Sequence, residues 1–484
     1  MANWEEHFKS RLITPEQAAE LVQPGMRVHF PPMHGPAVPL ALAKRAQKLE
    51  GPINLRLASP LVDLGWGNGT LSPFLNIEFE LFVGNVARPL HDRKLAPYLP
   101  NLFSTSFKAH DERPTEDKPV DIVFVTTTPP NSKGFVSFGA HQWNKRMYVR
   151  RAHCAVAEID RKALRTYGDV YMHVSEFDYF VELRPDVETV EDVMARMDPA
   201  KREAVNAIIA EAGLERVERI KPYLERSSPY DLRLLLGLVD PPEEFKTIAG
   251  YLSEVVEDEA TIQIGIGDPS SQMARLGAFD AKHDLGLHSE MVAPKVAKLV
   301  EAGVINGRKK TIHRGKAVAV AWSGSDPEDY RIIDDNPRFE LYDPEYVLNI
   351  STIAANHKQT AINNAISVDL AGQITVETAG GGRFINGTGG LPELHIGAFI
   401  SRGGRAITLL PSTALGGRVS RIVPQLETGT LVTIPRFFAD TVITEYGIAR
   451  LLGKNHRERA AELIAVAHPD FRFELSRAAK QLFG

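Results

Sequence analysis

The sequence predicts an α/β protein with two mostly parallel sheets and a helical segment between them. Short apolar runs alternate with amphipathic stretches through residues 1–185, and the same alternation returns through residues 245–484. Such alternation is typical of parallel sheets covered by helices. Residues 186–244 are instead charged and helix-favouring. We therefore expect an N-terminal α/β domain over 1–185, a helical insertion or linker over 186–244, and a C-terminal α/β domain over 245–484.

The N-terminal part begins its predicted sheet with a strand that runs into a proline-containing loop. Gly25–Phe30 is the predicted strand, residues 31–35 form the loop, and Val38–Leu49 is the predicted helix. Further strands are predicted at Ile53–Ala58, Ile77–Phe82, Asp121–Thr126 and Ala152–Ile159.

The same patterns of apolar residues predict the helices and strands of the middle segment and of the second α/β region. Apolar residues three and four apart over Val190–Arg196 and Lys201–Ile209 predict surface helices. The second region is expected to contain a strand at Thr261–Ile264, a turn, and a helix from about Ser270. Later strands are predicted at Ala317–Trp322, Ile407–Leu410 and Leu431–Ile434, and charged helices at Arg457–Leu463 and Phe471–Phe483.

Composition excludes several classes of protein. The 56 basic and 61 acidic residues are mixed along the chain, so a general nucleic-acid or membrane-surface protein is not indicated. No apolar run approaches the ~18 residues of a membrane span, and the first residues lack a secretory signal, so we expect a cytoplasmic protein. The single cysteine, Cys154, allows no intrachain disulfide, and its apolar neighbours predict a buried strand residue.

A glycine turn marks the start of the C-terminal region. Gly265 and Gly267 follow the predicted strand at Thr261–Ile264, and Ser270 stands where a dinucleotide fingerprint would have its third glycine. Glycines allow close approach of the backbone to a ligand, and helix N-terminal amides favour negative charge. A nicotinamide cofactor site and a purely structural turn both remain open from this motif alone.

Glu290 lies in the apolar stretch Leu285–Val292, about two dozen residues after this turn. In a dinucleotide site it would bind ribose hydroxyls, and in a structural role it would cap the next helix. A third interpretation makes it a nucleophile, because a carboxylate in a water-poor cleft can attack an acyl carbon. Spacing does not separate the three.

Glycine-rich segments then cluster within a short part of the chain, at Gly380–Gly382, Asn386–Gly390 and Gly403–Gly404, followed by Pro411–Arg421. This density favours backbone amides close to a substrate, as an oxyanion or phosphate site needs. Arg418 and Arg421 could pair with phosphate or carboxylate, or be solvated. There is no Walker loop, no GxSxG elbow and no metal-ligand spacing among the histidines, so we expect no metal.

Ordered motifs over most of the chain resemble the class I CoA-transferases, in particular the acetyl-CoA hydrolase/transferase and 4-hydroxybutyrate CoA-transferase branch. In the N-terminal half, Thr128–Gly139 looks like the family's SPPDxxGxxSxG loop, and Ala157–Asp160 with Thr166–Asp169 is similar to the next signature. The matching segments of the C-terminal half are Gly265–Gly267, His288–Met291, Val368–Leu370, Asn386–Gly390, Pro411–Ala414, Ser420–Pro424, Thr444–Gly447 and Ala467–Phe471.

The resemblance implies two open α/β domains of the CoA-transferase (NagB/RpiA-like) type, related by pseudo-symmetry, with the active site between them. It implies that Glu290 is the nucleophile, and that Asn349 and the amides near Gly389 and Gly390 steady an oxyanion. On the same basis Gly265, Gly267 and Gly387 are expected at the substrate, and Arg418, Ser420 and Arg421 at the CoA.

The implied reaction moves CoA from an acyl-CoA to an acceptor carboxylic acid through a glutamyl-CoA thioester on Glu290. Coenzyme A then acts as a substrate and no metal is needed. The implied partners are acyl-CoA and a small acid, with a second copy of the chain in a homodimer or dimer of dimers. Hydrolysis of acyl-CoA by the same nucleophile is the alternative, and a nicotinamide-dependent oxidoreductase is a more distant one.

The sequence also departs from the family pattern near the expected pocket. Leu415 replaces a common lysine, which puts one CoA phosphate contact in doubt. Ser367 replaces a usual glutamate, and Asp268-Pro269 and Leu391–Leu394 differ from common forms. We therefore expect the acyl specificity to be unusual. The helical segment at 186–244 is expected either to pack over the cleft, to join a subunit interface, or to decorate the surface.

Overall fold

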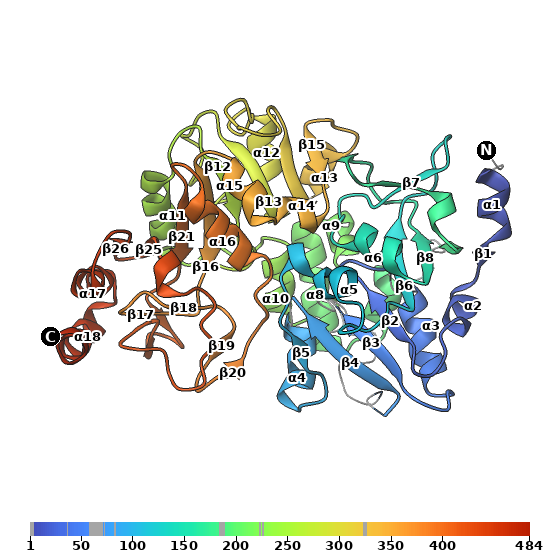
Figure 1. The fold of residues 1–484 in the computed structure, drawn as a ribbon, viewed down its shortest axis with the longest axis horizontal. Coiled ribbons are helices and arrows are strands. Elements are labelled where there is room, and N and C mark those ends of the chain that lie inside the picture. Colours follow the sequence, from blue (N-terminus) through green and yellow to red (C-terminus); the bar gives the residue numbers. More distant parts are fainter. Residues whose placement is uncertain are drawn as a thin grey trace.

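The computed structural model describes residues 4–35, 37–57, 71, 73–81, 84–182, 189–221, 224, 227–322 and 327–484. It contains two large sheets that lie side by side along the longest axis, with the two chain termini at opposite ends (Figure 1). This arrangement confirms the predicted α/β class. Within the described ranges, no helix combines the length and apolar character that a membrane span needs.

The first sheet has eight strands, and every described pair of neighbours is parallel. In spatial order the strands are β1 (Leu12–Ile13), β11 (Tyr179–Glu182), β8 (Cys154–Ile159), β6 (Ile122–Thr127), β2 (Arg27–Phe30), β3 (Ile53–Leu57), β4 (Leu75–Glu80) and β5 (Tyr98–Leu99). Helices α2 (Pro15–Glu20), α3 (Ala37–Ala46), α4 (Gly84–Asp92), α5 (Lys108–Glu112) and α6 (Lys145–Arg151) accompany it.

Within the described residues, the second sheet has nine strands, and all neighbours are parallel except the edge pair Thr441–Thr444 and Gly447–Arg450. In spatial order they are β26 (Gly447–Arg450), β25 (Thr441–Thr444), β21 (Arg405–Leu409), β16 (Gln359–Asn364), β12 (Thr261–Ile264), β13 (Gly286–Val292), β14 (Ala317–Trp322), β15 (Phe339–Leu341) and β9 (Tyr167–Gly168). Its helices include α11 (Glu243–Val255), α12 (Val296–Glu301), α13 (Pro327–Ile333), α14 (Pro344–Val347), α15 (Ile350–Ala355) and α16 (Leu391–Ile400). Helices α17 (His456–Ala465) and α18 (Pro469–Phe483) complete the chain.

The two sheets share one topology, as the pseudo-symmetry predicted. In the first, the chain runs outward through β2, β3, β4 and β5, then returns to build β6, β8 and β11 on the other side of β2. In the second, β12 to β15 and then β16, β21 and β25 repeat that order. The order in which the chain adds strands therefore reverses at one point in each sheet. This point lies between β2 and β6 in the first sheet and between β12 and β16 in the second. Ligands bind at the carboxyl ends of strands at such reversal points.

One strand of the N-terminal half joins the sheet of the C-terminal half. β9 comes from the N-terminal half but pairs in parallel with β15 at the edge of the second sheet. The contact is close, because a Cβ atom at Gly168 would overlap the carbonyl oxygen of Leu341. An isolated bridge between His141 and Ala321 adds a second backbone link nearby. The halves are therefore tied together through main-chain hydrogen bonds as well as side chains.

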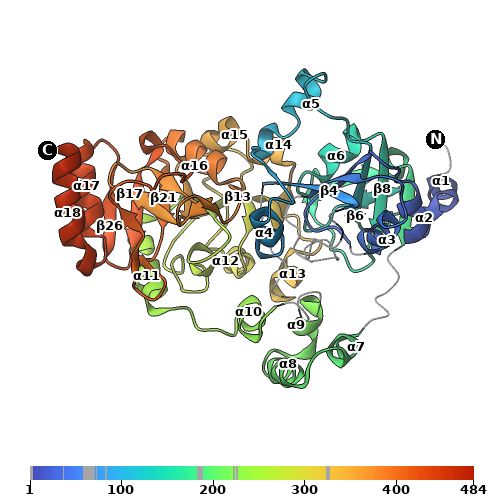
Figure 2. The same cartoon turned by 90° about the horizontal axis from the view of Figure 1, so that it is seen from below.

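The segment between the halves is helical, as predicted. It contains α7 (Val190–Ala195), α8 (Pro199–Ala212), α9 (Leu214–Arg219) and α10 (Pro229–Leu235). These helices share a small apolar core of their own, which includes Val193, Val205 and Leu232. Figure 2 shows them along one side of the molecule between the two halves.

Two predicted elements are wrong. Only one turn of 3₁₀ helix forms at Ser270–Gln272, and turns follow it. Gly277 has a φ of 78°, outside the helical range, so a regular helix does not continue through this segment. No strand forms at 431–434, where Ile434 makes only an isolated bridge with Ile374. The other predicted strands agree within about two residues, although Ala58 and Phe82 lie outside the described residues.

Candidate active site

Strand β13 presents His288 and Glu290 on one face, since they are two residues apart. His288 is fully buried, and burial lowers the pKa of its imidazole to about 3, so the ring is neutral. Its Nε2 donates to Val347 O at 2.7 Å, which ties β13 to the end of α14. Next to it, Gln359 of β16 donates to the His288 carbonyl oxygen at 3.2 Å. The backbone around Glu290 is therefore held by its neighbours.

The Glu290 carboxylate is half-buried and receives one backbone hydrogen bond. Its Oε2 accepts from the Gly390 N–H at 2.8 Å. Burial raises the pKa of Glu290 to about 8, the Gly390 hydrogen bond opposes this rise, and the nearby charge of Glu393 adds to it. Removal of water from a carboxylate makes the charged form less stable and more reactive.

Glycine at position 390 allows the backbone to approach Glu290 closely. A Cβ atom there would overlap Glu290 Oε2 and lie 3.0 Å from Leu348 Cδ1. The φ angle of Gly390 is −85°, which any residue can adopt, so the constraint is space rather than backbone conformation. The close approach lets the Gly390 amide point directly at the carboxylate.

The rest of this glycine loop packs against the N-terminal half. The Gly389 N–H donates to Leu81 O at 2.9 Å, and a Cβ atom at Gly387 would overlap that same oxygen. Just before the loop, Arg88 of α4 donates to Ile385 O at 2.8 Å. Of the predicted oxyanion donors, the structure thus places the Gly390 amide at Glu290 and engages the Gly389 amide elsewhere.

The Asn349 side chain has a structural partner. Its Oδ1 accepts from Ser351 N at 2.9 Å and caps α15, and its side chain is exposed. The residue before it, Leu348, contacts the position of Gly390. Its Nδ2 group is not engaged by the cap, so the side chain can donate to a ligand without losing that bond.

The glycine turn lies at the reversal point of the second sheet. Thr261 pairs with Gly286 and Ile262 with Leu287, so the register carried forward puts Gly265 level with Glu290. A Cβ atom at Gly265 would lie 2.6 Å from Asn363 Oδ1. Gly267 has a φ of 94°, and its carbonyl accepts from Asn364 Nδ2 at 2.9 Å. Both predicted glycines therefore lie against β16, and the register places Gly265 at the level of Glu290.

The three predicted CoA-binding residues lie on or beside one hairpin after β21. Its strands are β22 (Thr413–Ala414) and β23 (Val419–Ser420), and Leu415 at its tip is 68% exposed. Arg418 donates to Leu415 O and Ser420 to Ile422 O, whereas the partly buried Arg421 lies near Glu445. β21 is three strand positions from β13, or ~14 Å across the sheet. No described contact joins this hairpin to Glu290.

An apolar cluster that contains residues of both halves lies beside the glycine loop. Leu81 and Met33 of the N-terminal half pack in one cluster with Met291 and Leu348 of the C-terminal half. The sequence did not point to Met33 or Leu81, because they join this cluster only through contact between the halves. It marked Glu393 only as part of Leu391–Leu394, three residues after Gly390.

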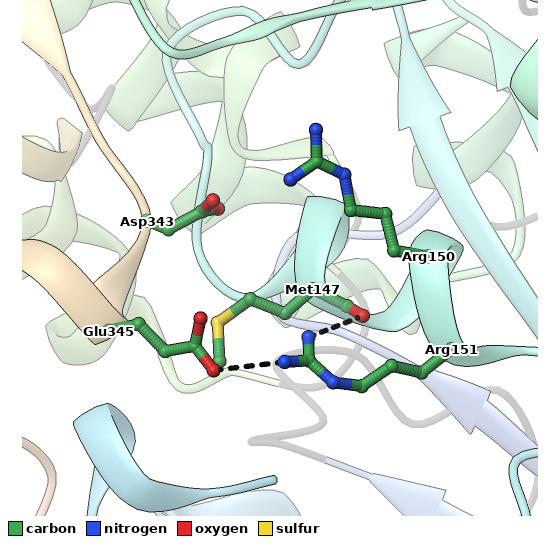
Figure 3. Close-up of a pocket in the computed structure, with 5 residues that line it drawn as sticks. All are labelled: Met147, Arg150, Arg151, Asp343 and Glu345. Carbon is green, nitrogen blue, oxygen red and sulfur yellow. Dashed lines mark hydrogen bonds and ion pairs between the residues drawn. The ribbon is translucent and has the colours of Figure 1, made fainter. Parts of the chain in front are cut away.

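A separate polar cavity lies between α6 and α14. It has a volume of about 300 Å³ and is lined by Met147, Arg150, Arg151, Asp343 and Glu345. Arg150 and Asp343 point toward one another from opposite sides (Figure 3). Arg151 pairs with Glu345 at 3.2 Å, and burial raises the pKa of Asp343 to about 6. None of the predicted site residues lines this cavity.

Comparison with known proteins identifies the chain. Residues 1–191 match the acetyl-CoA hydrolase/transferase N-terminal domain, and residues 326–479 match the C-terminal domain of the same family. The chain belongs to the acetyl-CoA hydrolase/transferase family. It is therefore an enzyme that transfers CoA.

Individual relatives cover the whole chain. The chain is 34% identical to the 4-hydroxybutyrate coenzyme A transferase of Clostridium kluyveri, over 99% of this chain and 100% of that protein. It is 29% identical to the succinyl-CoA:cyclohexane-1-carboxylate CoA transferase of Geobacter metallireducens, over 99% and 97% of the two chains.

Solved structures give the same result for this CoA-transferase family member. RipA from Yersinia pestis matches with a TM-score of 0.79 and 26% identity, over 99% of both chains. The 4-hydroxybutyrate CoA-transferase (abfT-2) of Porphyromonas gingivalis matches with a TM-score of 0.71 and 25% identity, over 99% of this chain and 100% of that one. The expected CoA-transferase type of fold is confirmed.

Proposed function

We propose that the chain moves CoA from an acyl-CoA to an acceptor carboxylic acid by a ping-pong mechanism, with Glu290 as the nucleophile. One observation carries the proposal: a half-buried carboxylate with a raised pKa meets the Gly390 amide where the two halves join. The carboxylate can attack an acyl carbon, and the amide can stabilise negative charge that develops beside it.

In the first half-reaction, the ionised Glu290 attacks the thioester carbonyl of the donor. The C–S bond breaks, CoA leaves as a thiolate, and a mixed anhydride remains. The thiolate then attacks the glutamyl carbonyl, which releases the donor acid and leaves a glutamyl-CoA thioester. An acceptor carboxylate reverses these steps, so the new acyl-CoA leaves and Glu290 returns as a carboxylate. Each anhydride or thioester forms from another activated acyl group, so no other energy source is needed.

The surrounding residues take roles that suit these steps. The Gly390 N–H supports the ionised carboxylate before attack and can pass to the oxyanion as the tetrahedral intermediate forms. Asn349 can donate through Nδ2 while its Oδ1 caps α15. Gly265 and Gly267 provide close backbone approach at the level of Glu290, and Arg418, Ser420 and Arg421 bind the CoA at the outer end of the site.

The acyl group and the acceptor acid are proposed as a class. Relatives are named for 4-hydroxybutyrate, cyclohexane-1-carboxylate and succinyl-CoA, so a short-chain or dicarboxylic acid is the expected substrate. The Leu348 side chain, which lies near Gly390, favours the apolar part of such an acid. Asp268-Pro269 and Leu391–Leu394 differ from the family pattern beside the expected acyl pocket, which supports the expected unusual acyl specificity.

The exchange assay separates transfer from hydrolysis. The purified chain is incubated with acetyl-CoA, butyryl-CoA or succinyl-CoA, with and without a panel of short-chain and dicarboxylic acids, and the acyl-CoA products are separated by chromatography. We expect new acyl-CoA only when an acceptor acid is present. Release of free CoA at the same rate without acceptor would make hydrolysis the main reaction. A nicotinamide-linked reaction has lost its support, because family membership accounts for the glycine turn.

We further propose that the enzyme is a cytoplasmic homo-oligomer, a dimer or a dimer of dimers, with residues 1–185 and 245–484 as its two domains. The exposed Phe473 and Leu482 of α18 support an interface in the assembled protein. Light scattering of the purified chain tests this, and a monomer at micromolar concentration would contradict it.

A further inference from the structure

Glu393 is a buried carboxylate at the contact between the two halves. It lies in the first turn of α16, and its residue surface is 0% exposed. Its Oε1 accepts from Ser104 N at 2.8 Å and its Oε2 from Phe103 N at 3.2 Å. Both donors belong to the N-terminal half, at the short 3₁₀ helix η1 (Phe103–Thr105). A buried carboxylate is costly unless it is hydrogen-bonded, so this pair of bonds fixes α16 against η1.

The same helix begins at the residue that contacts Glu290. Gly390 immediately precedes α16, and its carbonyl accepts from Leu394 N at 3.0 Å, which attaches it to the first helical turn. The Gly390 N–H then donates to Glu290. Any shift of the start of α16 would move this amide relative to the carboxylate. The contact with the N-terminal half therefore affects the position of the Gly390 amide at Glu290. The connection has three hydrogen-bonded links: η1 to Glu393, Leu394 to Gly390, and Gly390 to Glu290.

Glu393 also acts on Glu290 through its charge. Its carboxylate contributes to the raised pKa of Glu290, and burial raises the pKa of Glu393 itself to about 7. The histidines on the adjoining segments are neutral, since burial lowers the pKa of His288 to about 3 and of His395 to about 4. Two arginines lie on elements packed against α16: Arg405 of β21 and Arg436 of the turn η5 (Arg436–Phe438). Neither contributes to the raised pKa of Glu290 or of Glu393.

We propose that Glu393 is a positioning residue, which clamps the start of α16 to the N-terminal half and so holds the Gly390 amide on Glu290. The inference rests on the proposed role of Glu290. It adds that the two halves must be in contact at η1 before the nucleophile is correctly placed, and that Glu393 acts on the reaction without touching the substrate.

The test compares Glu393→Gln, Glu393→Asp and wild type. The glutamine keeps the shape but loses the charge, and its Nε2 cannot accept an N–H. We expect the rate at which acyl-CoA labels Glu290, followed by mass spectrometry, to fall about 10- to 100-fold in Glu393→Gln. We also expect the acid limb of its kcat/KM profile to move to lower pH, because a like charge beside Glu290 has been removed. Glu393→Asp keeps the charge but is shorter, so we expect a three- to tenfold slower rate with an unmoved acid limb.

Asp440→Asn is the matched control. Asp440 is also a buried carboxylate that accepts a backbone N–H, from Ala406 at 2.9 Å, but it lies at the amino ends of β21 and β25. We expect it to lower the melting temperature and leave the labelling rate and the pH profile unchanged.

The outcomes separate this inference from the proposed function. If wild type forms the adduct and Glu393→Gln forms it equally fast with the same acid limb, the positioning role is wrong while the function stands. If wild type forms no adduct, the proposed function itself fails. Should Glu393→Gln not fold, the labelling rate of Glu393→Asp decides, and a rate equal to wild type would overturn the proposal.

Discussion

The two halves use one topology for two different tasks at their reversal points. In the N-terminal half, the loop after β2 is fixed by buried ionisable side chains: Lys145 Nζ donates to Met33 O at 3.3 Å, and Glu158 Oε1 accepts from Val38 N at 3.1 Å. Burial lowers the pKa of Lys145 to about 7 and raises that of Glu158 to about 7. These groups are turned inward, onto the backbone.

The corresponding turn of the C-terminal half is held by neutral groups. Asn363 and Asn364 of β16 and the hydroxyl of Ser270 bind the backbone of Gly265–Gly267 or approach it closely. The ionisable group, Glu290, lies on the next strand at the contact between the halves. The fold thus supplies a reversal point twice. Glu158 binds the backbone of its own half, whereas Glu290 binds the Gly390 amide beside the contact between the halves, and we assign the chemistry to Glu290. The N-terminal half then contributes apolar side chains beside the glycine loop and the η1 amides that bind Glu393.

The largest expected effect comes from removal of the proposed nucleophile. Glu290→Ala should lower CoA exchange by on the order of 10⁴-fold or more, because no covalent intermediate can form. The exchange assay with a paired acyl-CoA and acid measures this, and a melting curve like that of wild type shows that the fold is kept. Exchange at a wild-type rate would refute the division of tasks between the halves.

Gly390→Ala is expected to have the next largest effect. The new Cβ would overlap Glu290 Oε2, so the amide and the carboxylate must separate, and kcat should fall by ~10²–10³-fold. Gly250→Ala in α11 is the control, since a Cβ there meets nothing within 4 Å and its φ is not positive. That variant should keep full activity and gain ~0.5–1 kcal/mol in free energy of unfolding. Equal kcat in both variants would argue against the proposed contact.

The raised pKa of Glu290 predicts how stability depends on pH. The carboxyl holds its proton up to about pH 8 in the folded state and up to about 4.5 when unfolded. The folded state thus binds more protons between these values, so Glu290 costs stability increasingly as pH rises from about 4.5 to 8. Melting temperatures of Glu290→Gln should exceed those of wild type by a margin that grows over this range. A margin that stays flat would mean an ordinary pKa.

The smallest effect is expected in the N-terminal half. Lys145→Met removes the hydrogen bond to Met33 O, worth ~1 kcal/mol, and also removes a costly buried charge. We expect kcat to fall less than tenfold, with a modest change in melting temperature. A loss of kcat as large as that of Gly390→Ala would mean that N-terminal groups take part in the reaction. It would contradict the proposed division of tasks between the halves.

The sequence was sufficient for what is local and periodic, and insufficient for what depends on contact between distant segments. Apolar runs predicted strands such as Thr261–Ile264 and Ala317–Trp322, and the ordered motifs predicted the family. The roles of Glu290 and Gly390 stay predictions, although the structure places the two residues in contact. Met33 and the bonds of Glu393 to η1 could not be predicted, because they arise where the two halves meet. The helix predicted from Ser270 forms only one turn, and Gly277 takes a φ of 78° outside the helical range. The pairing of β9 with β15 was equally invisible, since Tyr167–Gly168 carries no strand signal longer than two residues.

The most direct measurement is the mass of the peptide that carries Glu290 after incubation with acyl-CoA in the absence of acceptor acid. The account predicts a CoA adduct on Glu290 that disappears when an acceptor acid is added and is missing in Glu290→Ala. Exchange that proceeds without any adduct on this peptide, or an adduct that persists in Glu290→Ala, would contradict it.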